Sequence, residues 1–138
     1  MEPIDARADR AATQIVDSAY AVHKTLGPGL LESVYETCLM HELGMRQVHA
    51  EHQVALPVIY DRITLDAGLR LDLIVEQRVI VELKSVDKLL PVHTAQVLTY
   101  LKLSGLRLGL LINFNEVLIK HGIHRVLNVP RSPAEVLT

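Results

Sequence analysis

The sequence has few of the residues on which several common kinds of site depend. It contains no tryptophan, one phenylalanine and one cysteine, Cys38. A single cysteine excludes an internal disulfide and a four-cysteine iron–sulfur cluster. So few aromatic residues provide little for the base-stacking surfaces of proteins that bind single strands. The seven histidines show neither an HExxH pattern nor clustered ligand spacing, so they do not predict a metal site.

Long apolar runs and a large excess of one charge are also missing. The longest apolar runs have the length of a strand, which is too short to span a membrane. The first residues lack the apolar core of a signal peptide, so we expect a cytoplasmic protein. A net charge of −2 and a pI of about 6.4 argue against a protein that coats nucleic acid nonspecifically. Any contact with nucleic acid should therefore be local, in a cleft.

The composition is that of a folded protein. Hydrophobic residues make up 49% of 138 residues, which is enough for one domain with a sizeable core. We expect one domain over residues 1–138, with its core at about 15–126 and a tail at 127–138. So high an apolar fraction fits either an ordinary monomer or a surface covered by a second copy in a homodimer.

Apolar residues at steps of three and four predict helices. The first is a long amphipathic helix from about Ile4 to Leu26, and a second runs from about Leu30 to Leu43. Pro91 opens a third helix, from about Val92 to Leu103. Each of the three ends next to a glycine, which suits a helix stop.

The remaining apolar segments predict strands. Pro57 within the first of them indicates an edge position or a bulge. The predicted strands cover residues 47–60, a segment after the turn at Asp61-Arg62 that runs through Leu69 to Val75, then 79–86, Leu106–Ile112, and around Val117 to Ile123. With the helices, this gives the order α-α-β-β-β-α-β-β. The sequence therefore predicts an α/β fold with a mixed sheet flanked by helices.

Three charged residues lie within two neighbouring strands that otherwise read as buried. Asp72 is in one strand, and Glu82 and Lys84 share one face of the next. A hairpin centred on Gln77 would set Asp72 opposite Glu82, with Cβ atoms roughly 4.5–5.5 Å apart. A two-residue turn would break that pairing unless a bulge restored it. Two carboxylates so close together would repel, and a divalent cation would relieve the repulsion.

Each candidate also has a plain structural interpretation. Glu82 and Lys84 could be an exposed pair on an edge strand. Glu32 and Glu36 could form a solvated stripe on a helix, and Gln96 and Tyr100 could be a surface pair four residues apart.

Three motifs carry a resemblance to known families. Asp72 with Glu82-Leu83-Lys84 resembles the D…(D/E)-x-K signature of the PD-(D/E)XK nuclease superfamily. Gln96-Val97-Leu98-Thr99-Tyr100 is similar to the Q-x-x-x-Y motif of its RecB-like branch. Gly29-Leu30-Leu31-Glu32-Ser33-Val34-Tyr35 resembles the G-x-x-E-x-x-Y motif of the bacterial GxxExxY protein family. The resemblance runs from about Ile15 to Val126, although Leu71 stands where the superfamily name has a proline.

The resemblance implies a restriction-endonuclease-like core and a metal-dependent nuclease that hydrolyses nucleic-acid phosphodiester bonds with Mg²⁺ or Mn²⁺. DNA is expected ahead of RNA as the substrate. A non-catalytic module or homodimeric scaffold with the same fold, and an enzyme acting on another phosphate ester, are the alternatives. By this resemblance the site consists of the metal ligands Asp72, Glu82 and Glu32, the catalytic lysine Lys84, and Gln96 and Tyr100 beside them.

Overall fold

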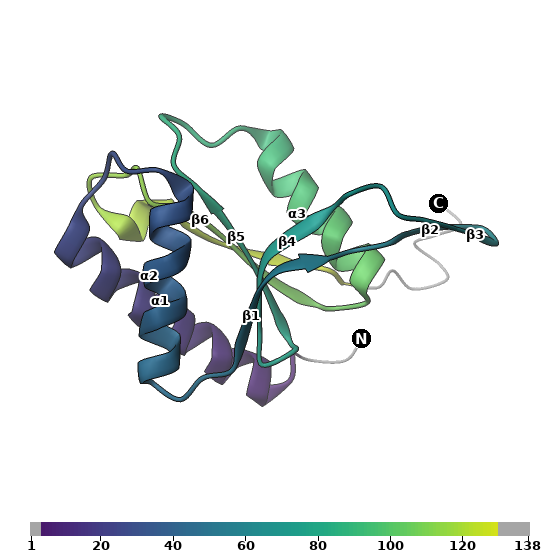
Figure 1. The fold of residues 1–138 in the computed structure, drawn as a ribbon, viewed down its shortest axis with the longest axis horizontal. Helices are drawn as coiled ribbons and strands as arrows, with labels where there is room; N and C mark the ends of the chain where they lie inside the picture. The colour runs from purple at the N-terminus through teal and green to yellow at the C-terminus, as the bar shows by residue number, and fades with distance from the viewer. Residues whose placement is uncertain (1–3, 130–138) are drawn as a thin grey trace.

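Three helices pack on a central sheet in the computed structural model, which describes residues 4–129 (Figure 1). The first helix begins after Asp5, whose side chain accepts a hydrogen bond from the backbone N–H of Arg7 (2.7 Å). The third has Pro91 at its first position and ends at Gly105, which adopts the left-handed conformation. The helices are α1 (Ala6–Leu26), α2 (Glu32–Met45) and α3 (Pro91–Ser104).

Five strands form the central sheet, in the order β1-β4-β5-β6-β7. Their neighbours are antiparallel except β5 and β6, which are parallel and joined through α3. The predicted mixed sheet with flanking helices is thereby confirmed. The strands are β1 (Ala50–Ala55), β4 (Arg70–Val75), β5 (Val79–Lys84), β6 (Leu108–Asn113) and β7 (Ile123–Leu127).

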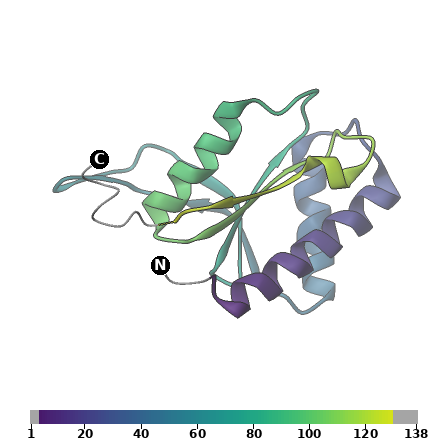
Figure 2. The same ribbon diagram turned by 180° about the vertical axis from the view of Figure 1, so that it is seen from behind.

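The sheet separates two apolar cores. Helices α1 and α2 cover one face, and α3 covers the other (Figure 2). The strands β5 and β6 lie at the centre and are buried along almost their whole length, as their near-continuous apolar sequences predict. On the α3 face, Gly109 permits close packing, because a Cβ atom there would lie 2.7 Å from Cγ1 of Val97.

A separate two-stranded hairpin, which we call the arm, projects from the sheet (Figure 1). It consists of β2 (Val58–Tyr60) and β3 (Ile63–Leu65). The predicted strand at 47–60 is therefore interrupted at Leu56-Pro57, and the strand predicted before Val75 is interrupted between β3 and β4. Tyr60 and Ile63 are 73% and 54% exposed, so the arm carries apolar side chains in solvent.

The last strand differs from its prediction. Residues Val117 and Leu118 are exposed, and the chain then forms a short 3₁₀ helix, η1 (Ile119–Gly122), before β7. A Cβ atom at Gly122 would collide with the carbonyl oxygen of Asn113, so this tight turn requires glycine. The predicted tail begins inside β7, and residues 130–138 lie outside the described part. No helix in residues 4–129 is long and apolar enough to cross a membrane.

Candidate active site

The β4–β5 hairpin has the predicted register and opens at the two acids. Val75 pairs with Val79, Ile74 with Ile80 and Leu73 with Val81, which are the pairs of a hairpin centred on Gln77. The turn is of the type that suits twisted strands, because Glu76 and Gln77 both have positive φ (52° and 54°).

Beyond Leu73, hydrogen bonds from backbone N–H groups to the side chains of the two acids replace the regular backbone hydrogen bonds between β4 and β5. The N–H of Asp72 donates to Oε1 of Glu82 (3.1 Å), and the N–H of Leu83 donates to Oδ2 of Asp72 (2.8 Å). Each carboxylate thus accepts a hydrogen bond from the opposite strand. This reciprocal arrangement holds the two acids together where the strands separate.

The alternation of β4 also changes at this point. Leu73 packs in the core beneath α1 and α2, whereas Leu71 packs in the core beneath α3. In the adjacent strand β1, Gln53 lies between the residues that pair with Leu71 and Leu73 and has a φ of 51°. This local distortion accompanies the turn of the Asp72 side chain toward β5.

Burial makes the acid pair electrostatically costly. Glu82 is only 5% exposed, and burial, followed by the nearby charge of Asp72, raises the pKa of Glu82 to about 8. The N–H of Asp72 and the charge of Lys84 act in the opposite direction. A carboxyl pair of this kind retains a proton at neutral pH unless a cation takes its place.

Lys84 ends β5 beside this pair. Its side chain is half-buried, and it forms no ion pair within residues 4–129. Its positive charge lowers the pKa of Glu82, and no carboxylate among the described residues forms an ion pair with it.

From α3, Tyr100 approaches the acids and Gln96 lies one turn away. Tyr100 is buried, and its pKa is raised by burial first and then by the charges of Glu82 and Asp72. Gln96 is exposed, and no hydrogen bond within the described chain links it to the acids.

The structure places Glu32 beside the end of β5 rather than against the acid pair. It is exposed at the start of α2, and its Oε1 accepts a long hydrogen bond from the N–H of Ser85 (3.4 Å). Within residues 4–129 no three His, Cys, Asp or Glu side chains are close enough to hold a metal ion together. Two of the three predicted ligands are thus brought together, and the contribution of Glu32 stays a prediction.

The segment from Gly29 to Tyr35 connects the helices to the end of β5. The hydroxyl of Tyr35 donates to the carbonyl of Gly27 (2.6 Å) and accepts from the N–H of Leu30 (3.1 Å). The carbonyl of Leu30 in turn accepts from Oγ of Ser85 (2.6 Å). Gly29 itself has a φ of 97°, which favours glycine. The motif therefore ties the α1–α2 loop to the residue after Lys84.

Asn113 is a site residue that the sequence analysis missed. Its buried side chain accepts from the N–H of Val86 (3.1 Å) and donates to the carbonyl of Val86 (2.9 Å). The next residue, Phe114, donates its N–H to the carbonyl of Lys84 (2.9 Å) and stacks on Tyr35. The one available signal was a polar residue that directly ends the apolar run of β6.

The carboxylate oxygens of Asp72 and Glu82 fit a hydrated divalent cation. Oδ1 of Asp72 and Oε2 of Glu82 accept no backbone N–H from the described residues, while the other oxygen of each does. Mg²⁺ binds through one or two carboxylates and retains several waters, so a pair of acids is sufficient.

A family model described as the PD-(D/E)XK nuclease superfamily matches residues 9–126. The match includes all six residues of the predicted site. Comparison with curated proteins and with solved structures finds no match.

Proposed function

Because this chain belongs to the PD-(D/E)XK nuclease superfamily, we propose that it hydrolyses phosphodiester bonds with Mg²⁺ or Mn²⁺ held by Asp72 and Glu82. The observation that carries this proposal is the reciprocal pairing of the two carboxylates at the buried opening of β4 and β5. Such a pair lowers the stability of the metal-free fold near neutral pH, because the poorly solvated Glu82 must take up a proton that the unfolded chain has lost. A function that needs a cation there would offset this cost.

Each side chain of the site has its own role in the proposed hydrolysis. When bound, the cation polarises the phosphate and makes its water more acidic. Asp72 and Glu82 would hold the cation through the oxygens that accept no backbone N–H. The ammonium of Lys84 stabilises the negative charge that develops on the phosphoryl oxygens. Tyr100 and Gln96 position the substrate from α3, and Glu32, beside the end of β5, would contact the cation only through water.

We further assign the chain to the GxxExxY family within the RecB-like branch. The contacts around this motif support the assignment. Tyr35 bonds to the loop that precedes α2, and Glu32 and the carbonyl of Leu30 accept hydrogen bonds from Ser85, directly after β5. The position of Tyr100 beside both acids supports the second motif.

The proposed substrate is nucleic acid, with DNA ahead of RNA. Basic side chains near the open end of the hairpin, Lys84, Lys88 and Arg70, would contact the phosphates. Binding through a few phosphates predicts that affinity falls with salt, with a slope of roughly −0.7 to −0.9 per contact. Titrating a labelled oligonucleotide in Ca²⁺ at several ionic strengths measures that slope.

Calorimetric titration with Mn²⁺ tests the metal site directly. The wild type should bind the ion, and Asp72→Asn should bind it at least tenfold more weakly, since it loses one anionic ligand. Asp66→Asn, in the exposed segment after the arm, is the matched control and should bind as the wild type does. Cleavage assays with DNA and RNA in Mg²⁺ then identify the substrate. Equal Mn²⁺ affinity in Asp72→Asn and wild type would refute the site.

A non-catalytic scaffold is the second candidate, and the arm favours it. The cross-strand pairs Val58–Leu65 and Tyr60–Ile63 place four apolar side chains on one face of a hairpin that projects from the molecule. An apolar face of this kind suits a second copy of the chain in a homodimer. Mass measurement in solution across a dilution series distinguishes a dimer from a monomer.

A further inference from the structure

A pocket of about 380 Å³ lies at the turn end of the β4–β5 hairpin, away from the acid pair. Its walls come from the first turns of α1, the segment before β1 and the turn into β5. Arg78 lies in the turn directly before β5, four residues before Glu82, which is roughly 13 Å of extended chain. The pocket is thus separate from the candidate active site.

Positive charge dominates this pocket. Arg7, Arg10 and Arg78 line it, with Glu76 as the single acidic residue of the lining. Arg46 stands at its rim, where it contacts Gln14 (3.5 Å). This clustering is notable because the whole chain has a net charge of −2.

Asp5 shows how the rim of the pocket holds an anionic group. Its Oδ1 accepts from the backbone N–H of Arg7 (2.7 Å), and its Oδ2 accepts from Nε of Arg78 (3.3 Å). The guanidinium groups of Arg7 and Arg10 have no ion-pair partner within residues 4–129, whereas Arg46 and Arg78 each have one. Among the described residues, two of the three lining guanidiniums therefore have no carboxylate partner that a ligand would have to displace.

A smaller hollow of about 180 Å³ adjoins the same residues. Asp5 and Arg78 also line this second space, together with Arg107. Nε of Arg107 is buried without a hydrogen-bond partner in the described chain. A further guanidinium thus lies at the same end of the sheet with unused donor capacity.

We propose that this arginine pocket binds a phosphate group. Arginine forks match phosphate oxygens in geometry and charge, and the N-terminal end of α1 adds its own positive potential. The phosphate would come from a free nucleotide or from the end of a polynucleotide. This assignment does not depend on cleavage or on a metal at the acid pair.

Titration of the metal-free protein in EDTA at low salt tests the pocket. The probes are inorganic phosphate, adenosine 5′-monophosphate, and one oligonucleotide with either a 5′-phosphate or a 5′-hydroxyl end. We expect Arg7→Gln/Arg10→Gln to weaken phosphate-dependent binding at least tenfold. Lys24→Gln/Lys120→Gln removes the same charge from exposed positions outside the pocket and should leave the affinity within about twofold.

Asp5→Asn should change the affinity for phosphate in the opposite direction. Asparagine caps a helix as well as aspartate does, so α1 should remain intact. Removing the carboxylate that occupies Arg78 should tighten phosphate binding about threefold. Circular dichroism confirms that the helix content of each variant is unchanged.

The binding results distinguish a free nucleotide from a polynucleotide end as the source of the phosphate, and they also show whether the proposal fails. Binding of all phosphate probes indicates a general phosphate pocket, and binding of only the 5′-phosphorylated oligonucleotide indicates a polynucleotide end. No phosphate-dependent binding, or equal losses in the pocket and control variants, would overturn the proposal. Because no metal is present, this result leaves the nuclease proposal to its own assays.

Discussion

The two ends of the β4–β5 hairpin are built differently. At the turn end, Leu73 to Val75 pair regularly with Val79 to Val81 and bury apolar side chains. At the open end, the carboxylates of Asp72 and Glu82 receive the backbone N–H groups. The regular pairing at the turn end thus sets the two acids opposite each other. Beyond Leu73, hydrogen bonds to their carboxylates replace the bonds between the two backbones.

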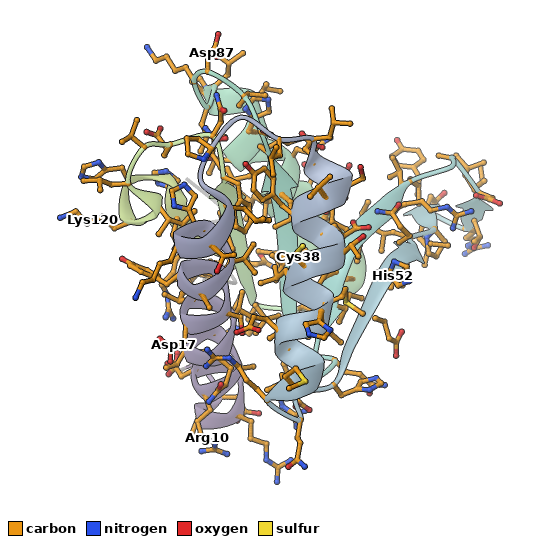
Figure 3. The ribbon with its side chains drawn as sticks, turned by 60° about the vertical axis from the view of Figure 1, so that its left-hand side comes forward. Arg10, Asp17, Cys38, His52, Asp87 and Lys120 are labelled. Carbon is orange, nitrogen blue, oxygen red and sulfur yellow. The ribbon has the colours of Figure 1, made fainter. Side chains whose placement is uncertain are left out.

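The charges around the hairpin are also separated. Arg10, at the arginine pocket, and Asp87, just beyond the open end, lie at opposite ends of the molecule (Figure 3). The open end has a buried acid pair suited to a cation, whereas the turn end has guanidiniums suited to an anion. Changes at one end should therefore leave the other end unaffected.

Lys84→Met should give the largest effect, and only at the open end. Methionine retains the bulk of the side chain but removes the charge beside Glu82, so we expect cleavage to slow by about 10²–10⁴-fold. Lys102→Met, on the exposed side of α3, is the control. Single-turnover assays in Mg²⁺ measure both rates. An unchanged rate in Lys84→Met would limit Lys84 to tuning the acid pair.

Stability should depend on pH through Glu82. Its folded-state pKa of about 8 exceeds its ordinary value of 4.5, so between these values the native state binds a proton that the unfolded state has lost. Metal-free stability is therefore greatest below pH 4.5, as far as this group is concerned, and falls by about 4 kcal/mol as pH rises to 8. Denaturant melts at several pH values measure this loss.

Glu82→Gln is the control for the pH effect. It retains an acceptor for the N–H of Asp72 but cannot ionise, so most of the decrease in stability with pH should disappear. Divalent cation should restore stability to the wild type at pH 8 and not to the variant. An equally steep decrease in Glu82→Gln would assign the pH dependence to other groups.

Asn113→Ala should weaken the segment after Lys84. It removes both hydrogen bonds to Val86 and leaves partly buried backbone groups without partners, at a cost of about 1–3 kcal/mol. Asn115→Ala, which loses one long exposed contact, should cost less than about 0.5 kcal/mol. Urea unfolding of both variants provides the comparison. Equal losses of stability in the two variants would show that the hydrogen bonds between Asn113 and Val86 contribute little to stability.

Gln77→Gly should give the smallest effect, at the turn end. Its φ of 54° suits glycine, so we expect stability to rise by about 0.5 kcal/mol. Metal and phosphate affinities should both stay at the wild-type values. A change in Mn²⁺ affinity would show that the turn end and the open end are coupled.

The register of the hairpin was predictable because its information is local. Two apolar runs around Gln77 determine which residues face each other, and the buried acids are conspicuous within them. The position of Glu32 was not predictable in this way. It depends on how α2 meets the end of β5, which is a contact between residues 53 positions apart.

Exposure explains the other differences from the prediction. Val117 and Leu118 read as the start of a strand but are 79% and 53% exposed, whereas β7 contains the polar pair His124-Arg125. An edge strand needs only one buried face, so its sequence is a weak signal. Asn113 was missed because composition cannot distinguish an asparagine at a turn from one that bonds a distant backbone.

The arm has a consequence for how the chain opens. Its strands β2 and β3 pair only with each other, and an isolated two-stranded hairpin is marginally stable in water. The arm should therefore exchange its amide hydrogens far faster than β5 and open without unfolding the sheet. Trypsin should cut first after Arg62, at the arm's exposed turn. The two fragments would remain associated, because β1 and β4 stay paired on either side of the cut.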